Sequence, residues 1–196
     1  MKPFAVLLLV TLAVCKPTVY MIRHGEKPDD DGTGLSTQGQ QRAQCLRSVF
    51  GASSQYNIGY ILAQEYKSNG KRERPYDTVL PVATDLGLTV DTSCDRDDSK
   101  CVKKAVKNYS GSGNILICWE HNELTSIAEE LGVDDAGDYP DDRFDLIWTL
   151  LPLMTLLHQR LLNSVLALIH KVKSDRFELI IHRKCIPCQK RRMWCW

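Results

Sequence analysis

The sequence predicts an α/β protein, a three-layer α/β/α sandwich with a mostly parallel central sheet. Short runs rich in β-branched and aromatic residues alternate with segments in which apolar residues recur at helical spacing. This alternation is typical of parallel strands joined by helices that cover both faces of a sheet. The chain has 196 residues, of which 43% are hydrophobic and 25% are charged, which is enough for one domain with a full core.

The first half of the chain supplies two strands and a helix between them. Residues 18–22 read Thr-Val-Tyr-Met-Ile and lead into a polar loop, so we expect the first strand there. Ser36 or Thr37 can cap the following helix, which is expected over about residues 38–50. A second buried strand is expected at residues 60–63.

The next elements continue the alternation. A helix is expected to end at Gly87, and Pro75 and Pro81 leave its start open. Another helix is expected over residues 100–109. The apolar run at residues 114–119 is the clearest strand in the sequence.

Two histidines directly follow predicted strands. His24 follows the first strand and His121 follows the strand at residues 114–119. The carboxyl ends of parallel strands meet at one edge of a sheet, so we expect these side chains to face one crevice. A neutral imidazole is a nucleophile near neutral pH, and the guanidinium of Arg23 beside it can hold two phosphoryl oxygens. The pattern indicates cleavage of a phosphate ester.

Residues 18–28, which contain Arg23-His24-Gly25-Glu26, resemble the signature of the histidine phosphatase superfamily, also called the phosphoglycerate-mutase-like family. The stretch from Arg74 to residue 88 resembles the family's second arginine and its helix, and residues 119–121 resemble its second histidine after a strand. The resemblance covers about residues 18–148 and is nearest to small fungal secreted members.

This resemblance implies a phosphohistidine on His24, a second catalytic histidine at His121, and phosphate binding by Arg23 and Arg74. It implies no metal ion and no other cofactor. Two alternatives remain open at the level of sequence. Arg72 competes with Arg74 for the second position, and His121 could be inert or bind a metal together with neighbouring residues, although adjacent strand residues point to opposite faces.

The sequence leaves the proton donor for the leaving alcohol unassigned. One branch of the family has an acidic residue directly after the second histidine, where this chain has Asn122. Another branch uses a glutamate from the loop after the second-arginine helix, where this chain has only aspartates. The candidates are Glu26, Glu123, Asp95, Asp97 and Asp98.

The predicted function is therefore hydrolysis of a phosphomonoester, carried by a small molecule or a peptide, through a phosphohistidine. The alternative is a catalytically weak or inactive domain of the same fold that binds phosphate or phosphopeptides. A formal net charge of +1 gives no indication of nucleic-acid binding or stable membrane insertion. The sequence does not indicate an oligomeric state.

The two ends of the chain differ from the expected domain at residues 16–149. Residues 1–15 read as a signal peptide, which predicts a secreted protein. Residues 150–196 carry nine lysines and arginines against two acidic residues. This basic tail is either foreign sequence, from a read-through intron or a shifted frame near Thr149, or a genuine amphipathic helix with a basic anchor.

The chain has eight cysteines, and in a secreted protein cysteines can form disulfides. Cys94 and Cys101 flank a short polar loop, and in an oxidising compartment we expect a disulfide between them. Cys185 and Cys188 have the spacing of a redox or zinc half-site, but no second pair accompanies them. Asn108-Tyr109-Ser110 is a glycosylation acceptor sequence.

Overall fold

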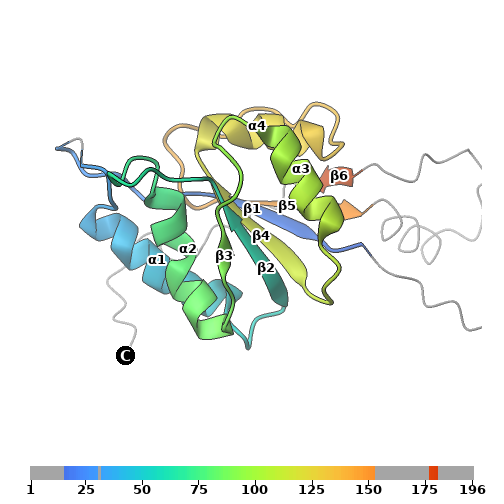
Figure 1. Cartoon of the computed structure of the whole chain (residues 1–196), viewed down its shortest axis with the longest axis horizontal. Coiled ribbons are helices and arrows are strands. Elements are labelled where there is room, and N and C mark those ends of the chain that lie inside the picture. Colours follow the sequence, from blue (N-terminus) through green and yellow to red (C-terminus); the bar gives the residue numbers. More distant parts are fainter. Residues whose placement is uncertain (1–15, 31, 153–176, 181–196) are drawn as a thin grey trace, which may run out of the picture.

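Six strands form one sheet in the order β3-β2-β4-β1-β5-β6 (Figure 1). The computed structural model describes residues 16–30, 32–152 and 177–180. The strands are β1 (Val19–Arg23), β2 (Ile58–Ala63), β3 (Val90–Asp91), β4 (Asn114–Trp119), β5 (Ile147–Pro152) and β6 (Phe177–Ile180). The first four run parallel, whereas β5 is antiparallel to β1 and β6 is antiparallel to β5.

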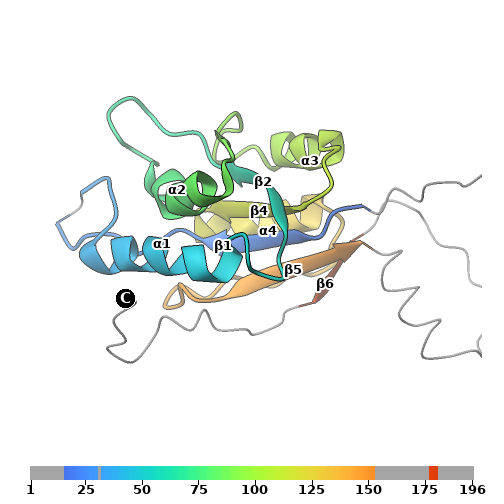
Figure 2. The same cartoon turned by 90° about the horizontal axis from the view of Figure 1, so that it is seen from below.

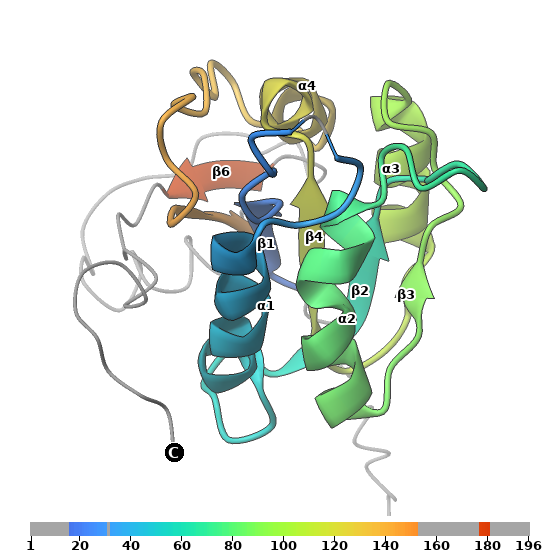
Figure 3. The same ribbon diagram turned by 90° about the vertical axis from the view of Figure 1, so that its left-hand side faces the viewer.

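Helices cover both faces of this sheet. The pair α1 (Thr37–Phe50) and α2 (Arg74–Leu86) lies side by side over one face (Figure 3). The pair α3 (Ser99–Asn108) and α4 (His121–Glu130) packs with the apolar cluster of the other face. The predicted α/β/α fold with a mostly parallel sheet is confirmed.

The central strands are apolar on both sides, because each face of the sheet is covered. In β4, Ile115 and Ile117 join the cluster under α3 and α4, while Leu116 and Cys118 join the cluster under α1 and α2. All four side chains are fully buried. This is why residues 114–119 read as a continuous apolar run in the sequence.

Local signals set the helix boundaries close to those expected. The Ser36 side chain accepts a hydrogen bond from the Gly39 backbone and caps α1. The helix α2 begins at Arg74, with Pro75 in its first turn where no backbone donor is needed. It ends at Gly87, whose φ of 65° suits a residue without a Cβ.

Four elements were not predicted: β3, α4, β5 and β6, the last of which lies within the predicted tail. The strand β5 pairs with β1 and borders it on the side of β6 (Figure 2). The predicted boundary after Thr149 falls inside β5, so the sheet continues to Pro152. Within β5, Trp148 is 1% exposed and Leu150 is fully buried.

The predicted signal peptide and most of the predicted tail, with Cys185 and Cys188, lie outside the described residues. Among the helices that are described, none has the length and apolar character needed to cross a membrane.

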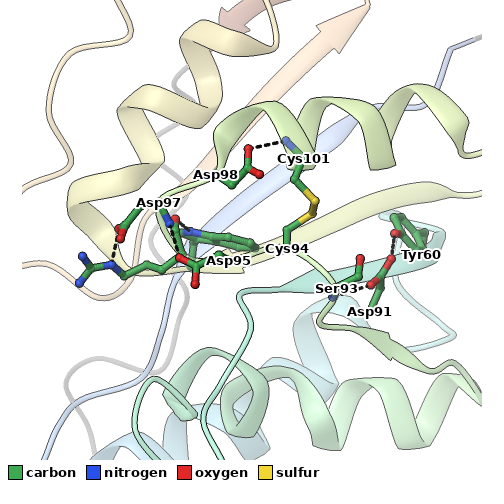
Figure 4. The surroundings of a disulfide bond; sticks show 10 residues. Tyr60, Asp91, Ser93, Cys94, Asp95, Asp97, Asp98 and Cys101 are labelled. Atoms are coloured by element: carbon green, nitrogen blue, oxygen red, sulfur yellow. Dashed lines mark hydrogen bonds and ion pairs between the residues drawn. A yellow bond between two sulfur atoms is a disulfide. The ribbon is translucent and has the colours of Figure 1, made fainter.

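The disulfide between Cys94 and Cys101 is present, as predicted (Figure 4). It joins the loop after β3 to the first turn of α3, with Cα atoms 5.6 Å apart. The same loop is tied to the end of β4, because the Trp119 indole donates to the Arg96 carbonyl over 2.8 Å. The loop is therefore fixed beside the carboxyl ends of the parallel strands.

Candidate active site

The end of β1 lies against the end of β4. The His24 backbone N–H donates to the Trp119 carbonyl over 3.1 Å, which brings the chain on either side of His24 next to the start of α4. Arg23 is 8% exposed and His24 is 6% exposed, so both polar side chains are buried. Such side chains require partners or a ligand, because burial without either is costly.

The His24 ring is held in one orientation. Its Nδ1 lies 2.6 Å from the Gly25 carbonyl oxygen, which can only accept, so Nδ1 carries the proton. The second ring nitrogen, Nε2, then keeps a free lone pair when the ring is neutral. The pKa of His24 is lowered to about 4, mainly by burial and also by Arg23, Arg74 and His121, while the hydrogen bond to the Gly25 carbonyl opposes this shift.

The groups that lower this pKa electrostatically are the ones that the sequence singled out. Arg23, Arg74 and His121 each act on the His24 ring, although they come from β1, the first residue of α2 and the first residue of α4. The structure thus brings together the four residues named from the sequence. The two guanidinium groups place positive charge near one neutral imidazole.

Arg74, and not Arg72, reaches this group. Its Nε donates to the Gly34 carbonyl over 3.1 Å, and its Nη2 donates to the Gly32 carbonyl over 2.7 Å. Arg72 instead forms an ion pair with Asp95, with Nη1 3.0 Å from Oδ2. The alternative that Arg72 takes the second arginine position is therefore not supported.

Arg23 is held by the segment at residues 141–144. Its Nη1 donates to the carbonyls of Asp141 over 2.6 Å and of Arg143 over 3.0 Å. The Phe144 ring packs on its guanidinium at 3.8 Å, a cation–π contact. Its buried Nε has no hydrogen-bond partner in the described part of the chain. A buried donor of this kind is costly unless a ligand accepts from it, and an oxyanion would do so.

His121 lies between two carboxylates. Its Nε2 is 2.9 Å from Asp141 Oδ1 and its Nδ1 is 2.7 Å from Glu120 Oε1. Glu120 also caps α4 by accepting from the Asn122 backbone. The first residue of a helix is suited to anion binding, because unpaired backbone N–H groups point out of the helix there.

A buried threonine couples two of these segments. Thr78 is fully buried, accepts from the Gly25 N–H over 2.8 Å and donates to the Arg74 carbonyl over 2.6 Å. It therefore fixes the loop after His24 against the first turn of α2.

The loop after His24 also touches the start of α1. A Cβ on Gly39 would lie 2.5 Å from the Glu26 carbonyl oxygen, which is closer than any real contact. Only glycine allows this approach between the helix and the loop.

Most of the predicted proton donors are engaged elsewhere. Both oxygens of Glu26 accept from the Arg42 guanidinium, and this pair is almost fully buried. Asp97 lies 2.5 Å from Arg96, and Asp98 caps α3 by accepting from the Cys101 backbone. These carboxylates hold the fold together.

Glu123 behaves differently from the other candidates. Partial burial raises its pKa, and Asp97 and Glu120 raise it further, while Arg96 opposes them. Glu123 therefore keeps a proton to a higher pH than an ordinary glutamate.

Sequence reasoning missed the segment at residues 139–145, which contributes Asp141 and Phe144 to the site. Its only signal in the sequence is a short polar stretch after α4, and this does not distinguish it from an ordinary surface loop. The segment was placed by tertiary packing rather than by a local motif.

Two open hollows lie away from this site. One has a volume of about 590 Å³ and lies between β2, the loop after β3 and α3, and the other lies along β2 and β3. None of the four site residues lines either hollow. Within the described residues, no group of His, Cys, Asp and Glu side chains is arranged to hold a metal ion.

No family model matches the chain, and no curated protein matches it. Solved structures do resemble it. The protein histidine phosphatase SixA, solved with tungstate, is 16% identical over 68% of this chain and 86% of its own, with a TM-score of 0.49. A SixA protein from Agrobacterium tumefaciens is 15% identical over 70% of this chain and 92% of its own, with a TM-score of 0.48.

A third solved structure, of an open reading frame product from Mycobacterium tuberculosis, spans more of the chain. It is 12% identical over 87% of this chain and 98% of its own, with a TM-score of 0.50. At this identity the likeness is one of fold. The chain therefore shares its α/β fold with this mycobacterial protein.

Proposed function

We propose that the chain is a phosphomonoester hydrolase that forms a phosphohistidine at His24 without a metal ion. The observation that carries the proposal is the state of His24: a buried, neutral imidazole in a fixed tautomer, surrounded by Arg23, Arg74 and His121. A neutral ring next to cations is the arrangement that a nucleophile for a dianionic phosphate requires.

The reaction proceeds in two steps. His24 Nε2 attacks phosphorus, while Nδ1 keeps its proton and donates it in a hydrogen bond to the Gly25 carbonyl. Arg23, Arg74 and His121 bind the phosphoryl oxygens, whose charge they stabilise in the transition state. Water then attacks the phosphohistidine, the N–P bond breaks and inorganic phosphate leaves.

The proposed substrate is a phosphomonoester on a small molecule or a peptide, and the proposed location is outside the cell. Secretion is supported by the predicted signal peptide together with the Cys94–Cys101 disulfide, because such bonds persist in oxidising compartments. The near-neutral net charge offers little attraction for nucleic acid or a membrane surface.

A binding domain of the same fold is the second candidate. It is favoured by Asn122, since an acidic residue at this position would have supplied a proton donor. Such a protein would bind phosphate through the two arginines but would not turn substrate over.

The test is a rapid acid quench after mixing the protein with a ³²P-labelled aryl phosphate in the presence of a metal chelator. We expect acid-labile, base-stable label on His24, absent from His24→Asn and formed more slowly in His121→Asn. Phosphate binding by titration with no label and no turnover would instead establish the binding domain. Label that disappears with the chelator would refute metal independence.

A further inference from the structure

We propose that Asp141 is the acid that gives a proton to the leaving alcohol, an inference that rests on the proposed phosphohistidine reaction. Asp141 Oδ1 lies 2.9 Å from His121 Nε2, and the Asp141 carbonyl accepts from Arg23 Nη1 over 2.6 Å. One residue thus touches two of the proposed phosphate-binding groups.

The exposure of Asp141 places it at the mouth of the site. Its side chain is 89% exposed, whereas the His121 side chain that it contacts is 13% exposed. A phosphoryl group bound to His121 displaces the carboxylate from Nε2 and leaves it beside the phosphate on the solvent side. The alcohol must depart toward solvent, so this is where a proton is needed.

The other carboxylates near the site are committed to partners. Glu26 is paired with Arg42, and Glu120 caps α4. Among the described residues, the Asp141 side chain contacts His121, and no lysine or arginine side chain forms an ion pair with it.

The segment that carries Asp141 is anchored on both sides. Before it, the Tyr139 hydroxyl accepts from the Leu146 N–H over 3.2 Å, and burial raises the pKa of Tyr139 to about 12, so this hydroxyl stays neutral. After it, the Phe144 ring packs on Arg23 at 3.8 Å. Asp141 therefore lies in a loop that is anchored on both sides.

The proton balance is simple. In the first step the His24 Nε2–P bond forms, the P–O bond to the alcohol breaks, and the carboxyl proton of Asp141 passes to the departing oxygen. In the second step the Asp141 carboxylate takes a proton from the attacking water as the N–P bond breaks. Asp141 is then protonated again, ready for the next substrate.

Asp141→Asn in the full chain tests this role with two substrates of unequal leaving groups. 4-Nitrophenolate is a good leaving group and departs without being protonated. The oxygen of an alkyl alcohol must receive a proton as it departs. We expect kcat on an alkyl phosphate to fall by about 10² to 10⁴ and kcat on 4-nitrophenyl phosphate to change by less than about tenfold. The neighbouring exposed residue supplies the matched control, Asp142→Asn, which should leave both rates unchanged.

Acid-quench labelling separates the two proposals. If wild type forms no phosphohistidine with 4-nitrophenyl phosphate, the proposed function fails regardless of Asp141. If wild type and Asp141→Asn are both labelled and the alkyl-to-aryl rate ratio is the same in the two proteins, the donor role is overturned while the function stands. A variant that binds inorganic phosphate more tightly with that ratio unchanged also overturns it, because Asp141 would then only compete for His121.

Discussion

At the scale of single residues, the protonation of His24 links the site to stability. Its pKa is about 4 in the folded chain, below the 6.5 of an unperturbed histidine, because burial disfavours the charged ring. Between pH 6.5 and 4 the unfolded chain therefore binds a proton that the folded chain does not, so stability is lost as the pH falls through this window.

The first prediction concerns this loss. The shift corresponds to about 3 kcal/mol at one histidine. Chemical denaturation of wild type and His24→Asn at pH 7 and pH 4 should show a smaller decline for the variant, by about that amount. Equal declines in the two proteins would show that His24 does not titrate differently on folding.

The second prediction concerns Thr78, whose hydroxyl bonds to Gly25 and Arg74. Thr78→Val keeps the shape but leaves the Gly25 N–H unpaired, at a cost of about 1 to 3 kcal/mol in the free energy of unfolding. It should also slow phosphorylation of His24, since both site segments lose their common anchor. Thr78→Ser keeps the hydroxyl and should retain most of the labelling rate; equal losses in the two variants would exclude a positioning role.

Arg23 and His24 could be predicted from the sequence, whereas Asp141 could not, and the reason is physical. Arg23 and His24 are adjacent and follow a strand, so their pairing is local and readable. Asp141 meets His121 across 20 positions that comprise α4 and the loop after it. Nothing local fixes such a contact, because it depends on how residues 139–145 fold back over Arg23.

At the scale of elements, the contact between α1 and the loop after His24 is set by one glycine. Gly39→Ala would improve the intrinsic helix propensity of α1 but place a methyl group 2.5 Å from the Glu26 carbonyl oxygen. Because that atom is backbone, either the helix or the loop must move.

The third prediction follows from that contact. We expect Gly39→Ala to lower the free energy of unfolding by about 1 to 3 kcal/mol and to reduce labelling of His24. Gly34→Ala is the control for stability, because a Cβ there meets nothing within 4 Å. Denaturation curves that coincide for the two variants would contradict the proposed close packing.

Two of the elements that were not predicted, α4 and β5, lack a boundary signal in the sequence. The helix α4 starts directly at the end of β4, so no turn residues separate strand from helix. The strand β5 reads as part of a longer apolar stretch, and its strand character comes from pairing with β1. The elements bounded by Ser36, Gly51 and Gly87, in contrast, carried their own stop signals and were placed correctly.

At the scale of the whole molecule, α3 carries two features that suit a secreted protein. Cys101 in its first turn is bonded to Cys94, and Asn108 ends it within the one Asn-X-Ser/Thr tripeptide of the sequence. Asn108 and Ser110 are both exposed, so a glycan would not disturb the core.

The fourth prediction is that the chain receives a glycan at Asn108 when a eukaryotic host secretes it under a host leader. Endoglycosidase treatment should lower the mass of wild type and of Ser110→Thr, which keeps the acceptor sequence, but not that of Asn108→Gln. A secreted, disulfide-bonded wild type whose mass does not change would refute this.

The fifth prediction locates the end of the folding unit. All described members of the two apolar clusters lie between Val19 and Leu150, and Leu150 is fully buried opposite Val19 in the β1–β5 pairing.

A chain ending at Pro152 loses the pairing with β6 but keeps this core, so it should unfold cooperatively with a near-native circular dichroism spectrum. A chain ending at Thr149 also loses the Leu150 side chain and half of β5, which should cost at least about 2 to 3 kcal/mol more in denaturant titrations. If the chain ending at Pro152 is already unfolded, residues beyond it belong to the fold; if both truncations are equally stable, Leu150 is not part of the core.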